Sequence, residues 1–219
     1  IVPKITLVSP GNGTVGTIVR VDGNGYQAGE TINIRFGSTS VIVSPTAASD
    51  GSFTTTFTVN TQKYGTTSVT ATGGTSNGSA TGTFFILPEV YQVSPNAGTV
   101  GRLITVSGTV FGAGNIIRIQ FGQTTSITNK QASAYGSWTA SFTINNQVYG
   151  TTTIIASDTS IAAATASNTL RILPYVTITP TAGSVGTAVF IDGNGYGSVE
   201  GVHIGFGTII TATTITSNA

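Results

Sequence analysis

Four landmark residues divide the chain into repeating units. Pro10, Gly16, Phe36 and Tyr64 return in the same order as Pro95, Gly101, Phe121 and Tyr149. The spacing between the two sets is about 85 residues, which is the size of one small domain and longer than a solenoid turn. A third set begins at Pro180. The sequence therefore predicts the tail of a preceding repeat at 1–3, repeat 1 at 4–88, repeat 2 at 89–174, and the first half of repeat 3 at 175–219.

Both ends of the printed sequence fall inside a repeat. Ile1-Val2-Pro3 matches the segment 86–88 that closes repeat 1, and Ala219 aligns with Ala134 in repeat 2. Repeat 3 would then carry about four of about seven strands. We expect the chain to be an excerpt of a longer array. The alternative is that another molecule completes the half-repeat by adding strands to its open edges.

The apolar pattern within the copies predicts half-buried β-strands. Two valines, Val19 and Val21, stay apolar in all three copies while the residue between them varies. The same period of two runs through the segments 32–36, 53–59, 69–71 and 84–86. About seven such strands, separated by Gly, Pro, Asn and Ser turns and without helical periodicity, predict an all-β fold of tandem immunoglobulin-like sandwiches.

Composition narrows the classes of function. Only 7% of residues are charged, the net charge is +1, and the Lys and Arg residues are scattered. A nucleic acid or an anionic membrane would therefore find no basic patch to bind. Cysteine is absent, which excludes disulfides, cysteine zinc sites and thiol catalysis. No apolar run has the roughly 20 residues needed to insert into a membrane. A charge-poor, Thr- and Gly-rich composition without cysteine or methionine favours an extracellular or cell-surface location.

Turn and core motifs carry a family resemblance. Repeat 1 opens with Ser9-Pro-Gly-Asn-Gly-Thr-Val-Gly16, continues as Val19-Arg-Val-Asp-Gly-Asn-Gly-Tyr26, and closes its next strand with Phe36-Gly37. Repeats 2 and 3 carry related strings. This pattern resembles the IPT/TIG class of immunoglobulin-like domains. The resemblance implies use as a stalk, an adhesin spacer, a surface-layer component or a filament subunit, and it implies no catalytic residues.

Few residues are candidates for chemistry. His203 is the single histidine and lies on the variable face of its strand, so no Ser-His-Asp arrangement can be assembled and we expect no enzymatic activity. The loops at Asp22 and Asp192 do not fit the EF-hand template. Glu30 and Glu200 accompany these aspartates, and repeat 2 lacks both members of the pair. A low-affinity Ca²⁺ site at Asp22 with Glu30, and at Asp192 with Glu200, would explain the joint loss; otherwise the sequence implies no cofactor.

Two sequons and several aromatic residues suggest contacts outside the core. Asn12-Gly-Thr14 and Asn77-Gly-Ser79 are candidate glycosylation sites. Tyr64 and Tyr149 precede a strand in each complete repeat, which predicts core or corner packing, like that of the buried corner tyrosine of immunoglobulin-like sandwiches; the alternative is stacking on a ligand. Phe85 and Phe190 align with arginines in other copies, so we expect them to point outward, toward a neighbour.

These observations predict a structural extracellular protein. Its head-to-tail repeats would form part of a microbial surface layer, stalk or filament, with copies of the same chain as partners and glycans as possible ligands. Short Pro-to-Pro junctions, from Pro88 to Pro95 and from Pro174 to Pro180, would limit hinge motion between repeats. The alternatives are an adhesin or carbohydrate-binding module, and a non-catalytic spacer of a larger secreted protein.

Overall fold

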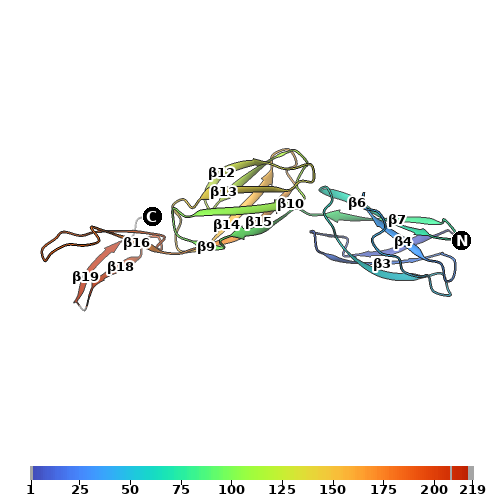
Figure 1. The fold of residues 1–219 in the computed structure, drawn as a ribbon, viewed down its shortest axis with the longest axis horizontal. Coiled ribbons are helices and arrows are strands. Elements are labelled where there is room, and N and C mark those ends of the chain that lie inside the picture. Colours follow the sequence, from blue (N-terminus) through green and yellow to red (C-terminus); the bar gives the residue numbers. More distant parts are fainter. Residues whose placement is uncertain (1, 208, 217–219) are drawn as a thin grey trace.

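A computed structural model describes residues 2–207 and 209–216, and all of the regular elements in this part of the chain are β-strands. Three β-bodies follow one another along the long axis of the molecule (Figure 1). The blue-to-teal body is repeat 1, the green-to-orange body is repeat 2, and the red strands belong to repeat 3. Residues 1, 208 and 217–219, which include parts of the predicted tail and of repeat 3, lie outside the described residues.

Repeat 1 is a sandwich of two sheets. The first sheet has the order β1-β3-β5, and the second has the order β2-β7-β6-β4. The strands are β1 (Lys4–Ser9), β2 (Asn12–Gly13), β3 (Ile18–Asn24), β4 (Ile32–Phe36), β5 (Phe53–Thr58), β6 (Gly65–Gly73) and β7 (Ser79–Ile86). All pairs are antiparallel except β2 with β7. The chain changes sheets between β1 and β2, near Pro10, so one N-terminal segment borders both sheets.

Repeat 2 reproduces this arrangement with one addition. Its sheets have the orders β13-β10-β8 and β12-β11-β14-β15-β9. The strands are β8 (Glu89–Ser94), β9 (Ala97–Gly98), β10 (Leu103–Thr109), β11 (Ile116–Phe121), β12 (Thr124–Gln131), β13 (Trp138–Thr143), β14 (Gly150–Asp158) and β15 (Thr165–Ile172). β12 pairs with β11 in a ladder with one register shift between Ile119 and Phe121, whereas the corresponding part of repeat 1 makes only the isolated bridges Thr31–Thr46 and Ile34–Val43.

Each complete repeat encloses its own apolar core. Val19 and Val21 are fully buried, as the alternation predicts. The ring of Phe36 lies 5.0 Å from that of Phe57 and 5.9 Å from that of Phe84. In repeat 2, the ring of Phe121 lies 5.2 Å from that of Phe142 on the opposite sheet. The prediction of an all-β chain of tandem immunoglobulin-like sandwiches is confirmed.

Repeat 3 consists of two hairpins in the described residues. β16 (Tyr175–Thr179) pairs with β17 (Phe190–Asn194), and β18 (Gly201–Phe206) pairs with β19 (Ile209–Thr216). No further strand covers these hairpins within the described part of the chain. As a result Phe206 is 79% exposed, although its counterpart Phe36 is fully buried.

Candidate functional site: loop carboxylates and repeat junctions

A buried carboxylate ties two loops of repeat 1 together. Glu30, at the end of the β3–β4 loop, accepts hydrogen bonds from the N–H of Gln27 at 2.7 Å and of Thr75 at 3.2 Å. It also accepts from the N–H of Ser76 at 2.9 Å and the hydroxyl of Ser76 at 2.8 Å. The Ser76 backbone donor, followed by the other donors, lowers the pKa of Glu30 to about 2. Glu30 therefore holds the β3–β4 loop against the β6–β7 turn.

Repeat 2 makes the same connection with a carboxylate from a different strand. Asn115 replaces Glu30, and Asp158 at the end of β14 replaces Gly73. Asp158 accepts hydrogen bonds from the N–H of Gly112 at 2.9 Å, Ser160 at 2.8 Å and Ile161 at 2.9 Å. Burial raises the pKa of Asp158, but these donors and the Asn115 amide outweigh burial and keep the pKa below its ordinary value.

The three backbone donors occupy equivalent positions in both repeats. Gln27, Thr75 and Ser76 correspond to Gly112, Ser160 and Ile161 in the 85-residue register. The two carboxylate positions also exclude each other, because a Cβ added at Gly73 would lie 2.6 Å from Oε2 of Glu30. In repeat 3, the N–H of Gly197 donates to Glu200 at 2.6 Å, as Gln27 does to Glu30. We call the carboxylate in this arrangement, which is Glu30, Asp158 or Glu200, the loop carboxylate.

The aspartates of the calcium hypothesis lie in a different setting. Asp22 is on β3, where it accepts a hydrogen bond from Nε of Arg20 at 2.9 Å, and this bond lowers the pKa of Asp22. Asp192 is exposed on β17. No group of three or more His, Asp or Glu side chains that could hold a metal ion occurs among the described residues. These contacts leave the shared Ca²⁺ site an untested hypothesis.

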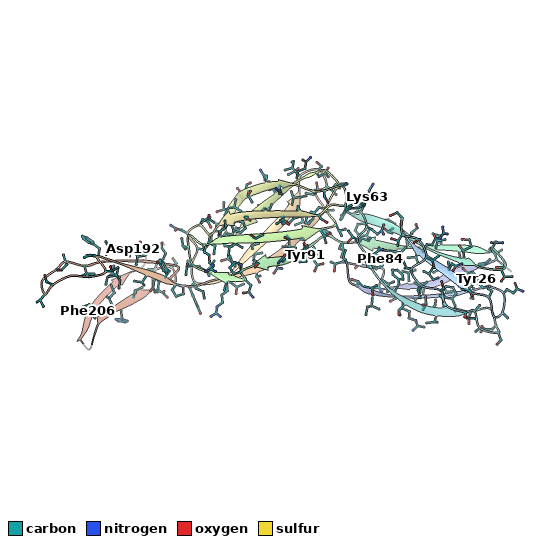
Figure 2. The ribbon with its side chains drawn as sticks, in the orientation of Figure 1. Tyr26, Lys63, Phe84, Tyr91, Asp192 and Phe206 are labelled. Carbon is teal, nitrogen blue, oxygen red and sulfur yellow. The ribbon has the colours of Figure 1, made fainter. Side chains whose placement is uncertain are left out.

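The junction between repeats 1 and 2 contains a valine in a left-handed conformation. Val110 follows β10, has φ of 64°, and is fully buried. Its side chain belongs to the buried apolar cluster of repeat 1, not to that of repeat 2. Tyr64 of repeat 1 packs against both clusters, with its ring 5.5 Å from and nearly perpendicular to Phe85. Figure 2 shows Lys63, the neighbour of Tyr64, at the end of repeat 1 that faces repeat 2.

The junction between repeats 2 and 3 uses polar counterparts of these residues. Tyr149 replaces Tyr64, and its hydroxyl accepts a hydrogen bond from Arg171 at 3.1 Å, with the guanidinium 5.9 Å from the ring centre. The N–H of Tyr149 donates to the carbonyl of Tyr196 at 3.4 Å. Gly195 replaces Val110 and has φ of 76°. A Cβ at Gly195 would lie 2.7 Å from the carbonyl oxygen of Leu173, so this junction brings backbone against backbone.

These junctions correct the prediction for one of the two tyrosines. Tyr149 is 51% exposed, so the prediction of core or corner packing is wrong for Tyr149; Tyr64 is half-buried but packs against the apolar clusters. Tyr26 is buried instead, and its hydroxyl donates to the carbonyl of Ala71 at 3.0 Å. Burial, followed by the nearby charge of Glu30, raises the pKa of Tyr26 to about 12. Sequence reasoning missed Tyr26, although it is the aromatic residue of the Gly-Asn-Gly-Tyr string.

The other candidate residues lie at the surface. Asn12 is exposed on β2, and Asn77 is exposed in the β6–β7 turn with φ of 56°. Both sequons are therefore sterically open, and glycosylation stays a prediction. His203 is exposed on β18 and Phe190 on β17, but the expected core residue Phe206 is exposed as well, so exposure in repeat 3 does not test their outward orientation. Among the described residues, no helix has the length and apolar character needed to cross a membrane.

Comparison with known proteins agrees at the level of the fold. The sequence profile described as the macroglobulin-like domain matches residues 3–86, which supports an immunoglobulin-like repeat 1 but does not confirm the IPT/TIG type. A search of curated proteins finds no match.

Three of the similar solved structures are an adhesin, a protein from a xyloglucan utilization locus and a cell adhesion molecule. The Yersinia pseudotuberculosis adhesin InvE is 15% identical, with a TM-score of 0.37 and coverage of 78% of this chain and 58% of its own. The SGBP-B protein from a xyloglucan utilization locus of Bacteroides uniformis is 19% identical, with a TM-score of 0.28 and coverage of 77% and 48%. The first eight Ig domains of the Down syndrome cell adhesion molecule are 14% identical, with a TM-score of 0.31 and coverage of 88% and 32%. The chain spans less than two thirds of each of these structures.

Proposed function

We propose that this chain is a structural repeat region that works outside the cell, as part of a microbial surface layer, stalk or filament. Its repeats would act as rigid spacers joined head to tail, and copies of the same chain would be its partners. We also propose that the repeats are of the IPT/TIG type and that they have no catalytic activity. The observation that carries the proposal is the packed junction of Val110 and Tyr64, which joins two complete sandwiches without an extended linker.

A row of uncharged hydroxyl pairs in repeat 2 supports association without charge. Across β10 and β13, hydroxyl groups pair at 3.0 Å for Thr105 with Ser141, 3.0 Å for Ser107 with Thr139, and 3.1 Å for Thr109 with Ser137. These pairs satisfy their own polar groups and carry no charge; Ser107 and Thr109 are buried, and the corresponding strand of repeat 1 carries the ion pair of Arg20 with Asp22.

A binding role is the second candidate. Exposed tyrosines at positions 91, 135 and 175 offer the amphipathic rings that protein and glycan ligands use. Figure 2 shows Tyr91 on repeat 2 near the junction with repeat 1. An adhesin or carbohydrate-binding module would use such residues, whereas a spacer of a larger secreted protein would need none of them. Glycans on Asn12 and Asn77 fit either role.

Electron microscopy of untagged protein and of native cell-surface material tests the proposal. The structural role predicts ordered filaments or lattices. A glycan array run on the same preparation provides the comparison, with a Tyr91→Ala, Tyr135→Ala double variant as the control for specific binding. Persistent monomers that bind glycans, and lose that binding in the control variant, would contradict the structural role in favour of the adhesin.

A further inference from the structure

We infer that the end of repeat 1 is an apolar socket for the loop residue of the next repeat, and that Val110 specifies this neighbour and fixes repeats 1 and 2 as one body. The socket is the part of the repeat 1 cluster that receives Val110; Tyr64 packs against this cluster, and Phe85 is in ring contact with Tyr64. The partner that fits it is a repeat with an apolar residue at the position of Val110. This inference does not depend on the proposed surface role.

The backbone at Val110 shows that its side chain is needed for something other than local folding. A β-branched residue with positive φ is a genuine outlier, and such a conformation persists only when its surroundings stabilise it. The equivalent residues are Gly25 and Gly195, with φ of 86° and 76°, and glycine adopts this conformation without strain. Repeat 2 thus keeps a disfavoured residue where the other repeats have glycine.

The compensation for this strain lies in the neighbouring repeat. Val110 is fully buried, and the cluster that buries it is otherwise built from residues of repeat 1. Burial of a valine side chain stabilises the docked state through the hydrophobic effect. The undocked state keeps the strained backbone but exposes the side chain. Docking therefore recovers free energy that repeat 2 cannot recover within its own fold.

The second junction shows what a different pairing requires. There the loop residue is Gly195, and the preceding repeat ends with Arg171 where repeat 1 has Phe85. The close approach of Gly195 to the backbone of Leu173 leaves no room for a side chain. The apolar end of repeat 1 thus meets Val110, and the polar end of repeat 2 meets Gly195. The residue type at this position matches each repeat to its neighbour.

Val199 provides a matched control in the same chain. It also has positive φ, 58°, and it also stands where the other repeats have glycine, at Gly29 and Gly114. Unlike Val110, it is 67% exposed. Replacement by glycine relieves backbone strain at both sites, but only at Val110 does it empty the socket.

The test measures the freedom of repeat 2 relative to repeat 1 in the full chain. Because the sequence has no cysteine, Thr58→Cys and Thr143→Cys place spin labels at equivalent exposed sites of the two repeats. We expect a narrow distance distribution in the parent and in Val199→Gly, and a distribution at least twice as broad in Val110→Gly. Val110→Ala, which keeps the strained backbone and truncates the side chain, should broaden it as well. An unchanged width in both Val110 variants would overturn the inference.

Discussion

Removal of the Asp158 carboxylate should destabilise repeat 2 strongly. In Asp158→Ala, the buried N–H of Gly112 loses its acceptor, and an orphaned buried donor costs about 1–3 kcal/mol. The N–H groups of Ser160 and Ile161 and the amide of Asn115 also lose their acceptor, but they are accessible to water, so each adds about 0.5 kcal/mol. The expected loss is about 3 kcal/mol. The same change should loosen the loop that carries Val110, because Gly112 lies two residues beyond it.

The exchange of carboxylate positions between repeats offers a sharper version of this test. Asn115→Glu alone would place two carboxylates at one set of donors, which is unfavourable. Asp158→Gly alone would leave the donors unpaired. The double variant Asn115→Glu, Asp158→Gly reproduces the arrangement of repeat 1, and we expect it to recover most of the stability lost in either single variant.

Urea unfolding followed by tryptophan fluorescence is the assay. The single tryptophan, Trp138, is buried in the core of repeat 2 and so reports on that repeat. The double-mutant cycle should show a coupling of at least about 2 kcal/mol. Additive effects of the two substitutions would refute the equivalence of the two carboxylate positions.

Three further outcomes follow from the structure. The folded-state pKa of Glu30, about 2, lies below its ordinary value of 4.5, so the contribution of Glu30 to stability is complete above about pH 4.5 and is lost as the pH falls toward 2. Acid unfolding of Glu30→Gln should lack this pH-dependent loss of stability. An acid-unfolding curve equal to that of the parent would contradict the prediction. Gly136→Ala should destabilise repeat 2 by at least about 2 kcal/mol, because Gly136 has φ of 73° and a Cβ would clash with the backbone of Phe111; a thermal melt equal to the parent would show that this turn can relax. Calcium at millimolar concentration should leave the melting temperature unchanged, because Glu30 already accepts four hydrogen bonds. A rise in melting temperature that is lost when Asp22 is replaced would establish the shared cation site instead.

The sandwich fold could be predicted from the sequence because the alternation of apolar and polar residues in a strand is a local property. Val19, Val21 and Phe36 repeat in kind in every copy, and a period of two with one apolar face admits few other structures. The same comparison drew attention to Glu30 through its loss in repeat 2. The comparison could not explain why repeat 2 has no carboxylate at this position. The compensating change from Gly73 to Asp158 lies on another strand, 43 positions away from Asn115 in the chain.

The junctions were harder to predict, since their residues face a neighbouring repeat and not their own core. Tyr64 and Tyr149 have the sequence context of a corner tyrosine, yet both lie where one repeat meets the next. The signal that could have identified the junction is the substitution of Val110 for a repeated glycine. A valine in a glycine-requiring turn indicates a contact that local sequence cannot explain.

Stretching a single molecule of the full chain between its ends tests most directly whether each complete repeat, joined head to tail to the next, unfolds as its own unit. Release of about 85 residues at about 3.6 Å per residue lengthens the chain by about 25–30 nm once the folded length is subtracted. The account predicts two force peaks with increments of this size, one for each complete repeat. A single larger increment, or extension without distinct peaks, would contradict it.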